Sequence, residues 1–120
     1  MMKIALLSAV LTAYCLNGFA QSSPMNIPSL TTASLNPVCA RLLEIEAQER
    51  AFDHGLCVGI ILGVEDNAHY DKKICVPSNI EIKGRVQAVR DYVATQPNRM
   101  NEAFASLVFD AMAEKWPCKN

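Results

Sequence analysis

Several patterns that mark enzymes are missing from this chain of 120 residues. It has no glycine-rich phosphate loop, no H-E-x-x-H motif and no nucleophile elbow, so three common kinds of catalytic site lack their signature. Its two histidines, His54 and His69, are fifteen positions apart. Glu65 and Asp66 are adjacent, and on a helix they point to different faces instead of converging as an acid–base pair. The sequence therefore predicts a protein that is not an enzyme and that holds no cofactor and no metal.

An excess of charge of one sign is also lacking. The chain has 11 basic and 12 acidic residues, a net charge of −1. Proteins that bind nucleic acid need a basic stripe or patch, so nucleic acid is not an expected partner. Beyond residue 20 no apolar run approaches the roughly 20 residues that a membrane-spanning helix needs, so we expect no membrane association after that point.

The first twenty residues have the pattern of a secretory signal peptide. Lys3 supplies a positive start, residues 4–16 are apolar, and Gly18-Phe19-Ala20 is a small-x-small cleavage site. The next segment, 21–35, is rich in Ser, Thr and Pro and is typical of a flexible lead-in. We expect residues 1–20 to be a signal peptide, 21–35 a lead-in and 36–120 a single helical domain of a secreted protein.

Four cysteines follow the signal peptide, and an even count in a secreted chain predicts two disulfides. The absence of any C-x-x-C pair argues against a zinc site. If the helices before and after Gln48 form a hairpin, Cys39 and Cys57 are equally far from its turn and face each other. This pairing leaves Cys75 to bond with Cys118. The alternative pairs, Cys57–Cys75 and Cys39–Cys118, stay open on loop length, and the favoured pairing fails if the two helices are continuous.

Hydrophobic periodicity predicts four helices and no strand, an all-α domain resembling a small four-helix bundle stapled by disulfides. The first helix is expected to begin with Asn36 as its cap and Pro37 at its first position, and to end between Gln48 and Ala51. The other three are expected at residues 52–67, 81–95 and 101–115, each with apolar residues three and four apart.

Three glycines, Gly55, Gly59 and Gly63, share one face of the central helix. Each glycine costs roughly 1 kcal/mol of helix stability relative to alanine. The apolar stripe beside them consists of Cys57, Ile61, Val64 and Ala68. We therefore expect this helix to be buried on most sides, with another helix of the chain lying against the glycines.

Four stretches, in this order, resemble the Rap/Tai immunity protein family. Residues 57–66 read C-V-G-I-I-L-G-V-E-D, similar to the family's C-x-G-Y-I-x-G-V-x-D, and residues 74–77 read I-C-V-P, similar to its x-C-x-P. Residues 91–97, D-Y-V-A-T-Q-P, resemble x-Y-L-x-x-H-P, and residues 114–118, E-K-W-P-C, resemble the closing aromatic-Pro-Cys. Ile60, Asn79 and Gln96 stand where the family has Tyr, Gly and His.

The resemblance implies a periplasmic antitoxin of type VI secretion that acts as a homodimer. Its partner would be a cognate peptidoglycan amidase effector, a cysteine amidase whose cleft the immunity protein blocks. Two polar segments are candidates for the blocking loop because Tyr, Arg and Met are enriched at interfaces. The partner-binding candidates are Asn67, His69, Tyr70 and Asp71 in the first segment and Gln96, Asn98, Arg99, Met100 and Asn101 in the second. The alternative function is a small periplasmic helical chaperone that binds many clients at low pH.

Overall fold

A computed structural model describes residues 29–44 and 51–119 of the chain. This part contains four α-helices and two short 3₁₀ helices, and its β pairing is limited to isolated bridges. The helices are α2 (Thr32–Ala40), η2 (Arg41–Leu43), α3 (Ala51–Tyr70), α4 (Ile82–Ala94), η4 (Pro97–Arg99) and α5 (Phe104–Lys115). The prediction of a small all-α domain is confirmed. The expected signal peptide, residues 1–20, lies outside the described residues.

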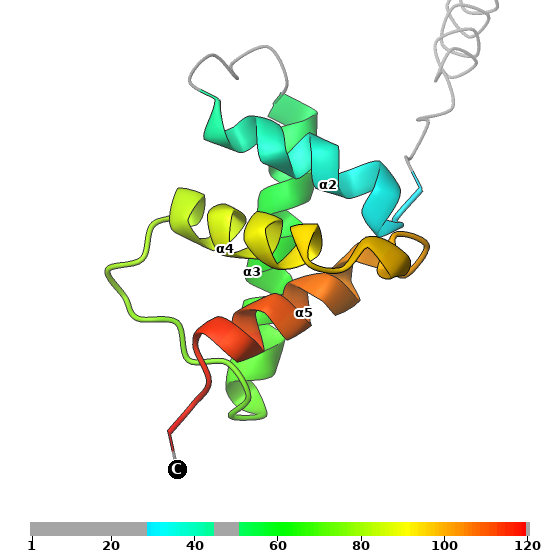
Figure 1. Ribbon diagram of the computed structural model, residues 1–120. Coiled ribbons are helices and arrows are strands. Elements are labelled where there is room, and N and C mark those ends of the chain that lie inside the picture. Colours follow the sequence, from blue (N-terminus) through cyan, green and yellow to red (C-terminus); the bar gives the residue numbers. More distant parts are fainter. Residues whose placement is uncertain (1–28, 45–50, 120) are drawn as a thin grey trace, which may run out of the picture.

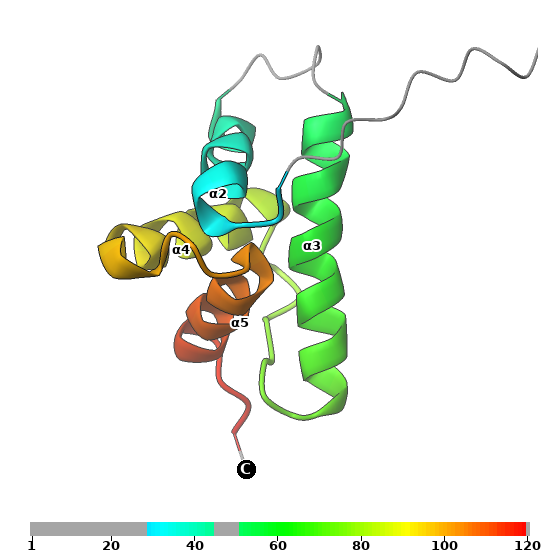
Figure 2. The same ribbon diagram turned by 90° about the vertical axis from the view of Figure 1, so that its right-hand side faces the viewer.

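The helices α2, α4 and α5 lie one above another across one side of α3, the longest of the described helices (Figure 1). Figure 2 shows that the opposite side of α3 faces away from them. The core lies where the apolar stripes of the four helices meet. Its buried residues are Leu35, Cys39, Cys57, Ile61, Ala68, Ile74, Val86, Val89, Val93, Phe104, Leu107, Val108, Ala111 and Met112.

The helix α3 buries one face only. We call Gly55, Gly59 and Gly63, all exposed, the glycine face. A Cβ atom built on any of the three meets no atom of the described chain within 4 Å. The expectations that α3 is buried on most sides and that another helix of the chain covers the glycines were therefore wrong. The physical reason is that α2, α4 and α5 pack against the face that carries the buried residues Cys57, Ile61 and Ala68.

The helix α2 begins five residues earlier than predicted, at Thr32 instead of Pro37. Its first N–H groups have no side-chain cap. They bond to backbone carbonyls of the α4–α5 connection: Thr32 N–H donates to Glu102 O and Ala33 N–H to Met100 O, both at 2.9 Å. A helix start is stable only when such groups find partners. Residues distant in sequence supply them here, which is why the local pattern at Asn36 was misleading.

The chain breaks between α2 and α3, as a helical hairpin requires, but the break comes early. Helical geometry ends at Leu43, and Glu44 is extended with φ −85° and ψ 143°. The expected helix end between Gln48 and Ala51 was therefore wrong, and so was the alternative of one continuous helix. Residues 45–50 lie outside the described part.

Two disulfides join segments that are far apart in sequence. One links Cys39 of α2 to Cys57 of α3, with a Cα–Cα distance of 5.3 Å. The other links Cys75 to Cys118, beyond the end of α5, with a Cα–Cα distance of 4.9 Å. This is the connectivity that the hairpin argument favoured. Closing loops of 18 and 43 residues restricts the unfolded chain by about 3 and about 4 kcal/mol respectively.

The helix α4 lies within one residue of the range 81–95 at each end, and its buried stripe is Val86, Val89 and Val93. The helix α5 begins at Phe104, three residues later than predicted. The delay has a tertiary cause, because Phe104 N–H donates to Leu30 O at 2.9 Å. The residues before it turn to meet the start of α2.

Candidate functional site

The first candidate segment is mostly helical. Asn67 lies on α3, and because this helix continues through Tyr70, three residues beyond the expected end, His69 and Tyr70 lie on it too instead of in a loop. Asp71 lies in the turn that follows. All four are exposed. Tyr70 is 86% exposed. This end of α3 therefore presents an aromatic ring to solvent among polar groups.

A tight turn ends α3. Lys72 has φ 53°, in the left-handed region that non-glycine residues seldom adopt. Lys72 N–H donates to His69 O at 3.0 Å and Lys73 N–H to Ala68 O at 2.9 Å. These two bonds form a Schellman motif, which fixes the direction in which the chain leaves the helix. We call residues 69–73 the α3 tip; Figure 2 shows this end of α3 reaching past α5.

The second candidate segment centres on Arg99, whose half-buried side chain bonds to three other side chains of the fold. Its guanidinium donates to Tyr92 Oη at 3.0 Å, Glu102 Oε2 at 2.8 Å and Asp110 Oδ2 at 2.7 Å. The hydrogen bond from Arg99 holds the pKa of the Glu102 carboxyl below its usual range. Arg99 thereby links α4, the α4–α5 connection and α5, which gives it a structural role. Its contact with a partner stays a prediction.

Two more residues of this segment, Gln96 and Met100, are also engaged in the fold. Gln96 is half-buried, and its side chain donates to Thr95 Oγ1 at 3.1 Å. Met100 packs against the core, and its carbonyl accepts a bond from α2. Asn98 and Asn101 are exposed. Of the five partner-binding candidates here, these two asparagines present their side chains to solvent.

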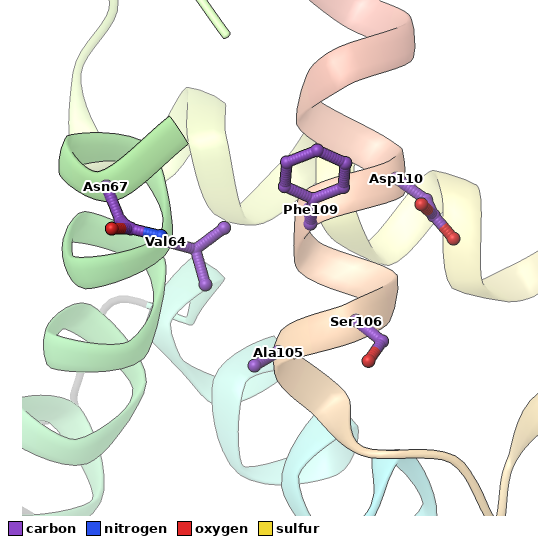
Figure 3. Close-up of a pocket in the computed structure, with 6 residues that line it drawn as sticks. All are labelled: Val64, Asn67, Ala105, Ser106, Phe109 and Asp110. Atoms are coloured by element: carbon purple, nitrogen blue, oxygen red, sulfur yellow. The ribbon is translucent and has the colours of Figure 1, made fainter. Parts of the chain in front are cut away.

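A groove of about 410 Å³ lies between α3 and α5. Its lining consists of Val64, Asn67, Ala105, Ser106, Phe109 and Asp110. Figure 3 shows Val64 and Asn67 pointing from α3 toward α5. Of this set, sequence reasoning named only Asn67 as a binding residue. The sequence signal that could have pointed to this groove is Phe109, an aromatic residue beside the apolar stripe of α5. In the structure Phe109 is 37% exposed.

The residues considered for catalysis do not converge. His54 and His69 lie near opposite ends of α3, about 22 Å apart along the axis at 1.5 Å per residue. Both carboxylate oxygens of Glu65 accept bonds from Arg85, at 2.6 and 2.9 Å. Among residues 29–44 and 51–119, no three His, Cys, Asp or Glu side chains gather as metal ligands would. The surfaces that remain are the α3 tip and the groove, and both are suited to binding.

A family model described as Rap1a immunity proteins matches residues 31–118. The chain belongs to this family. The match begins one residue before α2 and ends at Cys118, so it covers all the described helices. Membership implies an immunity protein that binds a cognate effector. No curated protein and no solved structure matched the chain.

The two disulfides of this Rap1a family member are typical of proteins that fold in an oxidising compartment outside the cytoplasm. None of its described helices combines the length and the hydropathy that crossing a membrane requires.

Proposed function

We propose that this Rap1a family member is a periplasmic antitoxin that binds and inhibits a peptidoglycan amidase effector of type VI secretion, without enzymatic activity of its own. The observation that carries the proposal is the family match over residues 31–118. The signal-peptide pattern of residues 1–20 and the two disulfides support a periplasmic location. Inhibition by occlusion needs a rigid scaffold and a projecting contact, and no catalytic residues.

We further propose that the α3 tip contacts the effector. Three features support this assignment: Tyr70 is largely exposed, the turn at Lys72 is held by backbone hydrogen bonds, and the tip lies beyond α5. A contact that is already ordered loses little conformational entropy on binding. Tyrosine is also among the residues that most often dominate interface energies. The α4–α5 connection is the weaker candidate because Arg99 and Met100 are engaged in the fold.

The effector can be identified by capture. The oxidised protein is immobilised, exposed to lysate of the source bacterium at neutral pH, and the bound proteins are identified by mass spectrometry. Recovery of one stoichiometric cysteine amidase supports the proposal. Recovery of many unrelated proteins, or of clients only after acidification, favours the chaperone alternative.

The contact is tested with Tyr70→Ala and a matched control, Phe52→Ala. Phe52 is also an exposed aromatic residue, 54% accessible, but it lies at the other end of α3. Losing a dominant tyrosine costs about 2 kcal/mol, or roughly 30-fold in Kd. We expect this loss for Tyr70→Ala alone, with little change in Tm for either variant. Equal affinities for the two variants would place the contact elsewhere.

The protein is also proposed to act as a homodimer. The resemblance implies this state, and the glycine face of α3, uncovered by the described chain and near the exposed Leu62, is the surface that supports it. Sedimentation equilibrium measures the mass directly, and a monomer at micromolar concentration would contradict the proposal.

A further inference from the structure

The two disulfides differ in their access to solvent. Cys39 and Cys57 are 2% and 1% exposed and belong to the core. Cys75 and Cys118 are only partly buried, and both line a hollow of about 510 Å³ beside the α3 tip. Thiol–disulfide exchange requires a thiolate to reach a disulfide sulfur. A thiolate in solvent can therefore reach the Cys75–Cys118 disulfide, whereas the Cys39–Cys57 disulfide is buried in the core.

The hollow also favours the formation of a thiolate. Its other lining residues are His69, Tyr70, Lys72 and Lys119, and no acidic residue is among the described side chains that line it. His69 Nδ1 lies 4.0 Å from Cys75 Sγ. Positive groups close to a cysteine stabilise its thiolate form. The asymmetry matters, because the imidazole lies against one sulfur of the pair and makes Cys75 the better leaving group.

We propose that Cys75–Cys118 is a thiol–disulfide exchange site, at which a thiolate attacks Cys118 and His69 stabilises the departing Cys75 thiolate. A new S–S bond forms between the attacking sulfur and Cys118 Sγ as the old bond breaks, and the electron pair of that bond goes to Cys75 Sγ. The product is a mixed disulfide and one thiolate, so this step consumes no other oxidant or reductant. A second thiolate that attacks the mixed disulfide leaves both cysteines reduced and the two attacking molecules joined as a disulfide.

Opening this disulfide removes the covalent tie between the segment after α3 and the C-terminal segment. The backbone contacts remain: Cys75 N–H donates to Trp116 O at 2.9 Å, and Ile74 pairs with Pro117 in an antiparallel bridge. The Cys39–Cys57 disulfide stays closed within the core. The exchange therefore alters the surroundings of Tyr70, which lines the same hollow, without breaking the link between α2 and α3.

The test treats the oxidised protein with reduced glutathione, stops the reaction by alkylation at timed points and locates the adducts by peptide mass spectrometry. We expect glutathione on Cys118 and the alkyl group on Cys75, with this pair opening at least about tenfold faster than Cys39–Cys57 because access limits exchange. Opening of both disulfides at one rate, or glutathione found mainly on Cys75, would overturn the proposal.

The role of His69 is tested by His69→Gln, which should slow the opening of Cys75–Cys118 roughly threefold, because a leaving thiol of higher pKa departs more slowly. His69→Lys, which places an ammonium group at this position, should restore the rate. The matched control is Lys83→Gln, which removes a positive charge from an exposed site on α4. Equal rates of opening for His69→Gln and the parent protein would refute the role assigned to His69. The opening rate of Cys39–Cys57 and the helical circular dichroism signal show whether the substitution has changed the structure in general.

A second arm identifies the source of the thiolate. A dithiol protein whose resolving cysteine has been replaced takes the place of glutathione, and the mixed disulfide is detected by non-reducing electrophoresis. Exchange with either reagent supports the site, and the faster reagent indicates whether a small thiol or a protein cysteine is the natural attacker. Exchange with neither would overturn the proposal.

Discussion

Replacing the glycines of α3 by alanine should stabilise the protein. Gly55, Gly59 and Gly63 lie inside a 20-residue helix, and a Cβ atom on any of them meets no atom of residues 29–44 and 51–119 outside its own helical turn within 4 Å. Within the described chain no steric cost opposes the gain in helix propensity, about 0.5–1 kcal/mol for each substitution and about 1.5–3 kcal/mol for all three. In a domain of this size 1 kcal/mol corresponds to roughly 4–8 °C in Tm.

Thermal and urea denaturation, followed by far-ultraviolet circular dichroism, measure this gain. Gly84→Ala in α4 is the matched control, because its Cβ would lie 3.1 Å from Cγ2 of Ile80. That contact is tight, so the gain at Gly84 should be smaller or reversed. At concentrations where the protein is monomeric, a lower Tm for Gly59→Ala would refute the reasoning, because an atom of the same chain would then have to lie against the added methyl group.

The same variants separate folding from association. If two copies meet at the glycine face, alanine should raise the stability of each subunit and weaken the dimer, because added methyl groups hold the two surfaces apart. Sedimentation equilibrium of the triple variant measures the second effect. An unchanged dimer affinity would place the homodimer interface on another surface.

Three further predictions concern the α4–α5 connection and the exposed disulfide. Arg99→Ala should lower Tm in thermal denaturation, because the carboxylates of Glu102 and Asp110 lose their shared partner; an unchanged Tm would contradict the structural role of Arg99. Replacing Cys75 and Cys118 together by alanine should lower the unfolding free energy in urea by about 4 kcal/mol; a loss well below 1 kcal/mol would show that the loop closure contributes little. Arg99 lowers the pKa of Glu102, so their bond stabilises the fold above the unfolded carboxyl pKa of about 4.3 and is lost as pH falls through the lower folded value. The Tm values of Glu102→Gln and the parent protein should therefore differ above about pH 5 and converge once the pH has fallen below the lowered folded pKa of Glu102; a gap that persists in strong acid would refute this assignment.

Several features of the fold could be read from the sequence because they depend on local patterns. The stripe of Val86, Val89 and Val93 repeats at helical spacing, and all three residues are buried. The pairing of Cys39 with Cys57 followed from equal distances to a hairpin turn. The short stretches that resemble the immunity family agree with the family model over residues 31–118. In each case residues within one element, or spacings along the chain, carried the information.

The errors arose where distant segments meet. The start of α2 depends on the carbonyls of Met100 and Glu102, and the Thr32 side chain bonds to a residue 70 positions away. Arg99 looked like a free loop residue because its partners Tyr92 and Asp110 come from two different helices. No local pattern reveals such contacts.

The sequence by itself determined the helical class, the two disulfides and the family, since periodicity, cysteine spacing and short motifs are properties of the chain alone. Only the tertiary structure decided which surfaces are free. Packing of α2, α4 and α5 against one face of α3 left the glycine face open, and the turn at Lys72 placed Tyr70 and the Cys75–Cys118 disulfide at the exposed end of the helix. Exposure depends on what every other segment covers, and that is settled only when the helices pack together.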